Sequence, residues 1–310
     1  MSMAFFIYMR FSSHPFPPII HPVDTNLLQT KLYIPILRPS LVPRPHLIAK
    51  LDGGQPHKLI LLSAPAGYGK TTLITEWINS QETAVCWLSL DEDDSAPYQF
   101  FSYLSAAKRP LTNNQTSFSL LLQSPQPPPA KKLMTAFVND VTAVSSPFTL
   151  ILDDYHTIES AEIDGAMAFL LDHMPPHMTL VITSRTDPGF PISRLRVRSQ
   201  LTEIRASDLR FSEAEAVKFL QQSMGLTLSL EQIAALETRT EGWIAGLQMA
   251  AIAIQSIPSK RQDGQSPLSP QGRADTDTFI AAFTGSHRFV LDYLIEEVMQ
   301  SQPEQTRNFL

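Results

Sequence analysis

The chain has 310 residues, enough for about two domains of roughly 150 residues, and its single cysteine, Cys86, excludes a disulfide-stabilised scaffold and favours the cytoplasm. Its 24 lysines and arginines against 30 aspartates and glutamates give a net charge of -6 with no dense basic run, so we expect no direct DNA binding by this chain. No stretch reaches the roughly 18 consecutive apolar residues that a membrane helix needs, so we expect no membrane contact.

The first residues carry no pattern typical of a folded element. Prolines crowd this region, and the apolar run at 3–9 is short and is followed, not preceded, by Arg10. We therefore expect residues 1–24 to form a disordered leader.

Five short apolar runs alternate with helical patterns in the next part of the chain. The strand-like runs lie at 59–63, 84–90, 148–152, 179–183 and 201–204, and helical patterns lie between most of them, at 71–79, 98–108, 131–144 and 161–173. Near-continuous apolar strands that alternate with helices are typical of a parallel sheet covered on both faces. The sequence thus predicts an α/β fold with a P-loop NTPase core at 25–205.

The strand patterns stop after residue 205. Two capping boxes follow, Ser212 with Glu215 and Ser229 with Gln232, and each precedes a helical pattern. A third apolar helix is predicted at 243–257. We therefore expect an all-helical subdomain, a helical lid, at 206–257.

The last part of the chain begins with a polar stretch rich in glycine, proline and serine, which predicts a flexible linker at 258–274. Helical patterns follow at 276–283 and 289–299, and Ser301 with Glu304 caps a helix that the end of the chain cuts off. Residues 275–310 are accordingly expected to be the truncated start of a further helical or winged-helix domain.

A phosphate-binding loop is predicted at 64–72 (APAGYGKTT), between a strand and a helix, with Ala64 in place of the first glycine. Backbone amides of such a loop wrap phosphates, Lys70 would reach the outer phosphate oxygens, and the Thr71 hydroxyl would ligate Mg²⁺. A glycine-rich turn with a solvent-facing lysine is the alternative, and the flanking strand and helix argue against it. The remaining expected ATP contacts are Ala66, Gly67, Gly69 and Thr72.

Polar residues also end two later strands. Asp153 and Asp154 follow the run at 148–152, and acidic residues at the carboxyl end of a parallel strand face the same crevice as the phosphate loop. We expect Asp153 to hold Mg²⁺ and Asp154 to be catalytic by polarising the attacking water. Arg185, at the end of the next strand, would sense the terminal phosphate. An Asp-Asp turn and a surface arginine are the alternative interpretations.

Eight segments in this order resemble the ATPase part of MalT-like, LuxR-type transcriptional activators, which belong to the signal transduction ATPases with numerous domains (STAND). The segments are TKLYIPILRPSLVPRPHL, SAPAGYGKTT, WLSLDEDD, LILDDYH, LVITSRTDP, LRFSEAEAVKFL, TEGWIAGLQMAA and FTGSHRFVLDYLIEEV. The resemblance runs from about Leu27 to the end of the chain.

The resemblance implies a nucleotide-binding core with strand order 5-1-4-3-2, a helical lid, a winged helix, an inducer-binding repeat sensor and a DNA-binding helix-turn-helix. ATP with inducer would favour self-association, and ADP would hold the resting monomer. It also places Arg44 in a segment that lies over the nucleotide, so the resemblance makes Arg44 an expected nucleotide-binding residue.

No segment of this chain matches the sensor or the helix-turn-helix, so we expect a fragment of a split gene or a stand-alone module. The predicted function is an ATP-binding signal-transduction switch, compatible with slow hydrolysis of ATP to ADP. The alternatives are a constitutive P-loop ATPase and an inactive protein-interaction fragment.

Overall fold

The computed structural model of the protein describes residues 27–53, 57–112, 116–126, 128–256, 270–283, 290 and 292–293. The expected leader at 1–24, most of the expected helix at 289–299 and the cap at Ser301 lie outside the described residues.

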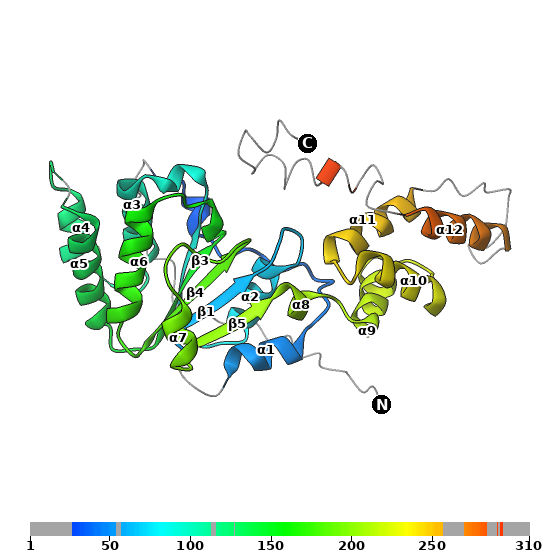
Figure 1. The fold of residues 1–310 in the computed structure, drawn as a ribbon, viewed down its shortest axis with the longest axis horizontal. Coiled ribbons are helices and arrows are strands. Elements are labelled where there is room, and N and C mark those ends of the chain that lie inside the picture. Colours follow the sequence, from blue (N-terminus) through cyan, green and yellow to red (C-terminus); the bar gives the residue numbers. More distant parts are fainter. Residues whose placement is uncertain are drawn as a thin grey trace, which may run out of the picture.

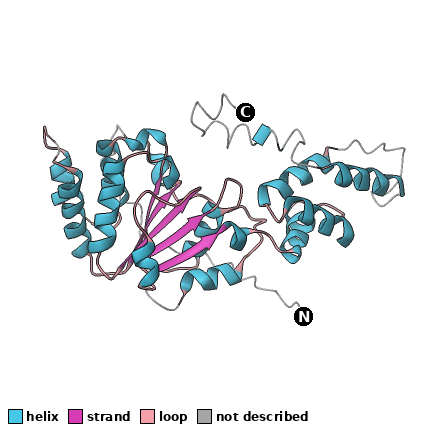
Figure 2. Cartoon of the chain, viewed as in Figure 1, coloured by secondary structure: helices cyan, strands magenta, loops and turns pink. Residues whose placement is uncertain are grey.

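A five-stranded sheet forms the centre of the molecule (Figures 1 and 2). All its strand pairs are parallel, and the order is β2-β3-β4-β1-β5, which confirms the expected order 5-1-4-3-2. The strands are β1 (Leu59–Ser63), β2 (Ala84–Ser89), β3 (Phe148–Asp153), β4 (Met178–Ser184) and β5 (Leu201–Arg205). β1 lies between β4 and β5, so the loop after β1 opens where the direction of the strand order reverses.

Helices cover both faces of the sheet, as predicted. Side chains alternate across a strand, so Leu59 and Leu61 of β1 enter one core while Ile60 and Leu62 enter the other. The first core is covered by α3 (Pro97–Ala107), α4 (Ser117–Leu122), α5 (Ala130–Thr142) and α6 (Ala161–His173), and the second by α1 (Pro45–Asp52) and α2 (Lys70–Asn79).

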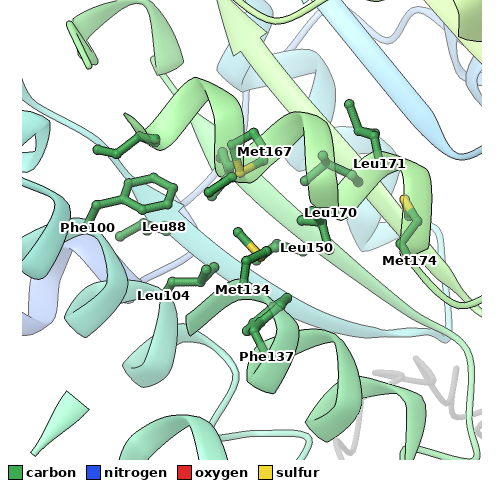
Figure 3. Packing of buried hydrophobic residues seen from close by; sticks show 14 of the residues in the cluster. Leu88, Phe100, Leu104, Met134, Phe137, Leu150, Met167, Leu170, Leu171 and Met174 are labelled. Carbon is green, nitrogen blue, oxygen red and sulfur yellow. The ribbon is translucent and has the colours of Figure 1, made fainter. Parts of the chain in front are cut away.

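The first core is built from facing rows of aliphatic, sulfur and aromatic side chains (Figure 3). Met167 and Leu170 of α6 lie opposite Met134 and Phe137 of α5, and in the view of Figure 3 Leu150 of β3 lies between the two pairs. Complete burial of each such side chain contributes about 1.5–3 kcal/mol, so this layer holds the strands in place.

Short elements complete the core. The 3-10 turn η1 (Gln29–Leu32) packs against β2 at one edge of the sheet, where the buried Lys31 ammonium lies 2.7 Å from the Asp94 carboxylate. Two further turns, η2 (Glu92–Ser95) and η3 (Tyr155–Thr157), follow β2 and β3, while α7 (Ser193–Val197) and α8 (Ala206–Leu209) flank β5.

A helical subdomain follows α8 and has its own core. It contains α9 (Glu213–Val217), the π-helical turn η4 (Lys218–Ser223), α10 (Leu230–Thr240) and α11 (Ile244–Gln255). Both predicted capping boxes are present: the Ser212 hydroxyl accepts from the Glu215 amide and the Ser229 hydroxyl from the Gln232 amide.

One predicted boundary is wrong. Helix α12 (Pro270–Ala282) begins inside the stretch 258–274, for which the sequence predicts a flexible linker, and before the predicted helix at 276–283. Proline suits the first position of a helix because its φ is already helical, and the polar residues after it show no apolar period that would reveal the helix. Among all the described residues, no helix combines the length and the apolar character that a bilayer crossing requires.

Candidate nucleotide-binding site

The predicted phosphate loop connects the carboxyl end of β1 to the first residue of α2. Gly67 and Gly69 have φ values of +77° and +75°, a left-handed conformation that glycine adopts at little cost. Gly69 is the N-cap residue of α2, so the loop leads directly into the positive end of the helix dipole. This arrangement suits the binding of phosphate groups.

Lys70 begins α2, and its side chain folds back into the loop. Its ammonium donates hydrogen bonds to the carbonyls of Ala64, at 2.8 Å, and Pro65, at 3.1 Å, and the residue is only 7% exposed. The positive charge of Lys70 is therefore held inside the phosphate loop, against the carbonyls of the loop's first two residues.

Asp153 receives hydroxyl groups from two other elements. The Thr71 hydroxyl donates to its Oδ1 at 3.0 Å, and the Thr183 hydroxyl, at the end of β4, donates to the same oxygen at 2.5 Å. Burial of Asp153 and the nearby charge of Asp154 raise the pKa of the carboxyl to about 6, although both hydroxyls and Lys70 act in the opposite direction. At neutral pH a buried carboxylate thus lies beside the loop.

These oxygens fit a hard divalent cation. Mg²⁺ prefers one or two protein oxygens together with phosphate oxygens and water, which matches Thr71 and Asp153 beside a phosphate loop. Within the described parts of the chain, no group of three or more His, Cys, Asp or Glu side chains has metal-site geometry. A cation here would accordingly depend on the bound nucleotide for its other ligands.

Asp154 lines a cavity of about 420 Å³, called the second cavity below, at the carboxyl end of the strands. Arg185 and the residues that follow β2 line it as well. Asp154 has a left-handed backbone (φ 60°), and its amide donates to the Thr183 hydroxyl at 2.9 Å. His156 borders this cavity, and its pKa falls to about 4 because of burial and the charges of Arg185 and Lys70. The ring is thus neutral at pH 7.

A larger cavity of about 480 Å³ is lined by the phosphate loop itself, including Gly67 and Gly69. Three parts of the chain line it: the segment 35–44, called the arm below; the loop with the start of α2; and the helical subdomain, including Phe211 and Ile244. Thr71 and Thr72 border it. A cavity of this size, with a mainly apolar lining and a few polar groups, is typical of a small-molecule or cofactor site.

The helical subdomain contacts the phosphate loop directly. The Trp243 indole donates to the Ala66 carbonyl at 3.0 Å, and the Ala245 amide donates to the Gly67 carbonyl at 3.1 Å. A Cβ on Gly67 would lie 2.5 Å from the Ala245 side chain. The first turn of α11 therefore rests on the loop.

Arg44 borders the larger cavity, but none of the hydrogen bonds described for its guanidinium goes to the phosphate loop. They go instead to Glu215 and to the carbonyls of Leu209 and Arg210. The Arg44 amide contacts the Glu76 carboxylate at 3.4 Å, and burial raises the pKa of this carboxyl.

The structure thus places the predicted residues in two adjoining groups. Ala66, Gly67, Gly69, Lys70, Thr71, Thr72 and Asp153 form the loop and its acidic neighbour, and Asp154 and Arg185 share the second cavity. Sequence reasoning did not assign roles to Thr183, His156, Glu76 or Trp243. Of these, His156 directly follows the LILDDY segment, and Trp243 lies in the TEGWIAGLQ segment, so both lay within stretches already noted.

Comparison with known proteins gives consistent matches. The NACHT domain family matches residues 58–224. Over 285 residues the chain is 35% identical to the HTH-type transcriptional regulator MalT of Klebsiella pneumoniae and 36% identical to that of Cronobacter sakazakii, matches that cover 92% of this chain. The chain spans only 30% of the length of these curated relatives.

A solved structure supports the fold assignment. The crystal structure of a STAND protein with a tetratricopeptide repeat sensor from Pyrococcus horikoshii matches with a TM-score of 0.50 and 14% identity, covering 88% of this chain and 34% of that one. At this identity the likeness shows the fold alone.

Proposed function

The chain belongs to the NACHT family and carries a MalT-like STAND ATPase region, and from this premise we propose that it is the ATP-dependent switch of a MalT-like transcriptional regulator. Proteins with a P-loop NTPase fold, which this chain has, generally bind a nucleotide together with a divalent metal ion. The proposal specifies ATP with Mg²⁺, with Lys70 on the phosphates and with Thr71 and Asp153 holding the cation. When bound, the cation would neutralise charge on the phosphates.

One observation carries the switch proposal: the pair of hydrogen bonds from Trp243 and Ala245 to the carbonyls of Ala66 and Gly67. They join the phosphate loop to the helical subdomain without an intervening residue. Any ligand that shifts this loop must also move the start of α11 or break these bonds. Phosphate occupancy can therefore be transmitted to the helical part of the protein.

Slow hydrolysis is the second element of the proposal. Asp154 and Arg185 line one cavity, and Asp154 directly follows Asp153, which accepts a hydrogen bond from Thr71 at the phosphate loop. In this arrangement a carboxylate can orient a water molecule and a guanidinium can contact the terminal phosphate. Hydrolysis to ADP would reset the switch.

The location and partners of the protein are proposed by analogy with the regulators that it matches. We place the protein in the cytoplasm, with self-association as the output of the switch and with no direct DNA contact by this part of the chain.

Trp243 provides the test. Its fluorescence should change when ATP or ADP with Mg²⁺ is added, because its indole is bonded to the loop. Of the three tryptophans, Trp77 and Trp87 lie in the core under the sheet, so replacement of both by phenylalanine isolates the signal.

The same titration on the Lys70→Ala variant gives the control. Loss of the fluorescence change there, with a retained fold by circular dichroism, supports binding at the loop. A change that persists with the affinity of the parent protein would contradict the proposed site.

A further inference from the structure

We propose that Arg44 is a positioning residue that clamps the helical subdomain in its closed arrangement over the nucleotide cavity. The inference rests on the proposed function only in that the cavity is taken to bind a nucleotide. It assigns Arg44 a role different from the direct nucleotide contact expected from the sequence.

Arg44 stands at the boundary between two packing surfaces. Two residues before it, Val42 is 4% exposed and belongs to the core of the helical subdomain. Three residues after it, Leu47 of α1 belongs to the core beneath the sheet. The Ser40 carbonyl also accepts a hydrogen bond from the Ser223 hydroxyl of η4. The arm is therefore built into the subdomain, and the chain returns to the sheet at Arg44.

The chain passes between the α/β core and the helical subdomain at two places, which we call crossings. The first is at Arg44, and the second lies between α8 and α9 (Figure 1). The Arg44 guanidinium binds this crossing with three well-formed hydrogen bonds: Nη1 to the Leu209 carbonyl at 2.8 Å, Nη2 to the Arg210 carbonyl at 2.8 Å, and Nε to Glu215 Oε1 at 2.9 Å. The side chain also lies over the Phe211 ring, and Arg44 is only 5% exposed. One residue thus ties both crossings together.

Glu215 extends the clamp into the subdomain. Its second oxygen, Oε2, accepts from the Ser212 amide at 2.8 Å and the Ser212 hydroxyl at 2.9 Å, which closes the capping box of α9. The start of the first subdomain helix and the arm therefore share one carboxylate. A planar guanidinium with several fixed donors can make these contacts at once, whereas a lysine ammonium is a single point charge.

The position explains why the clamp matters for the cavity. Residues on both sides of Arg44 line it, among them Leu41 from the arm and Phe219 from the subdomain, and the start of α11 reaches the phosphate loop. If the clamp loosens, the subdomain walls of the cavity separate from the loop. Affinity should then fall by the same factor for ADP and ATP, because no phosphate contact is lost.

The first experiment measures, without nucleotide, how fast trypsin cleaves the chain at the crossing between α8 and α9. Trypsin cleaves after arginine, and the Arg210 carbonyl is held by Arg44, so the bond between Arg210 and Phe211 should be protected. Arg44→Lys and Glu215→Gln should each accelerate cleavage at this bond, as followed by the mass of the fragment that ends at Arg210. The matched controls are Arg196→Lys and Glu203→Gln, which break another bidentate pair on the core (2.7 and 2.9 Å) and should leave the rate unchanged.

The second experiment titrates ADP and ATP with Mg²⁺ against the same variants. We expect Arg44→Lys and Glu215→Gln to weaken both nucleotides by a common factor of about 5 to 150, the usual range for coupled sites. The double variant should weaken binding no more than the stronger single variant, because both act through one contact.

Two outcomes would overturn the clamp. One is unchanged cleavage at Arg210 in both variants. The other is a loss that grows from ADP to ATP in Arg44→Lys alone, which would identify a direct phosphate ligand. The Lys70→Ala variant separates the two proposals: unchanged nucleotide affinity there contradicts the nucleotide site, whereas its cleavage rate at Arg210 should match the parent. Because Arg44 is buried, Glu215→Gln carries the test if Arg44→Lys does not fold.

Discussion

The Thr71 hydroxyl lies 3.0 Å from Oδ1 of Asp153, a residue 82 positions away in the sequence, and donates a hydrogen bond to it. The contact links the start of α2 to the end of β3. It places two oxygen ligands side by side at the phosphate loop, but it also keeps a carboxylate almost wholly buried. The same group should therefore serve cation binding and cost folding stability.

Asp153→Asn should stabilise the nucleotide-free protein at pH 7.5. Burial raises the pKa of the Asp153 carboxyl from its ordinary value of 3.8 to about 6 in the folded protein, so folding disfavours the ionised form. Each pKa unit corresponds to about 1.4 kcal/mol, which gives a gain of about 3 kcal/mol when the charge is removed. Urea unfolding of the parent and the variant measures this gain, and Mg²⁺-dependent nucleotide binding should weaken in the same variant.

The pH dependence of that gain follows from linkage. Between about pH 4 and 6 the folded state holds a proton on Asp153 that the unfolded state releases, so the stability of the parent falls as pH rises through this window. The advantage of Asp153→Asn should be small at about pH 4 and fully present at about pH 8. An equal advantage at both pH values would show that the burial cost is not electrostatic.

Lys70→Ala should abolish the thermal stabilisation by ATP. Ligand at about 100 times its Kd adds roughly 2.7 kcal/mol, and each kcal/mol raises Tm by about 2–4 °C in a protein of this size. Lys58 precedes β1, at the opposite end from Lys70, and its ammonium donates to the Leu171 carbonyl. Lys58→Ala should keep the full ATP-dependent rise in a thermal-shift assay, and an equal rise in Lys70→Ala would argue against the phosphate loop.

Asp154→Asn should suppress ATP hydrolysis about a hundredfold while sparing ATP binding, because it removes the charge that polarises water. Asparagine is the right replacement, since Asp154 has φ 60° and asparagine tolerates this conformation. Phosphate release under single-turnover conditions gives the rate. Asp172→Asn, on the exposed end of α6, provides the comparison, and equal rates in the two variants would remove Asp154 from the mechanism.

Gly67→Ala should displace α11 from the phosphate loop. The added Cβ would lie 2.5 Å from the Ala245 side chain and 2.8 Å from the Trp243 indole nitrogen. Gly225 also has a positive φ, but no atom lies within 4 Å of its Cβ position. Both substitutions therefore carry a backbone cost of about 1 kcal/mol, and only Gly67→Ala should shift the Trp243 emission and weaken nucleotide binding. The same emission spectrum in both variants would mean that α11 does not depend on this contact.

Much of the core could be predicted from the sequence because its strands are short, apolar and buried. Each of the five predicted runs overlaps an observed strand, and the meeting of Thr71 and Asp153 follows from the rule that parallel strands end at one edge. The metal and catalytic roles of these residues stay predictions.

The relation between the core and the helical subdomain could not be predicted in the same way. The contact from Trp243 to Ala66 spans 177 residues, and the bond from Arg44 to Glu215 spans 171. The hydrophobic periodicity of a segment indicates its own secondary structure, but it does not indicate which distant helix contacts a given loop. The start of α12 was missed for a different reason, because its first turn is polar and begins at a proline that otherwise indicates a linker.

The position of β1 in the sheet constrains how the protein folds during synthesis. All five residues of β1 are buried in the sheet, yet its neighbours are β4 and β5, and the first paired residue of β4, Leu180, follows Leu59 by 121 positions. At about 5–20 residues per second, a ribosome needs roughly 6 to 24 seconds to add that length. Until then the apolar β1 lacks both of its partner strands. Nascent chains that end before β4 should therefore be prone to aggregate and depend on chaperones.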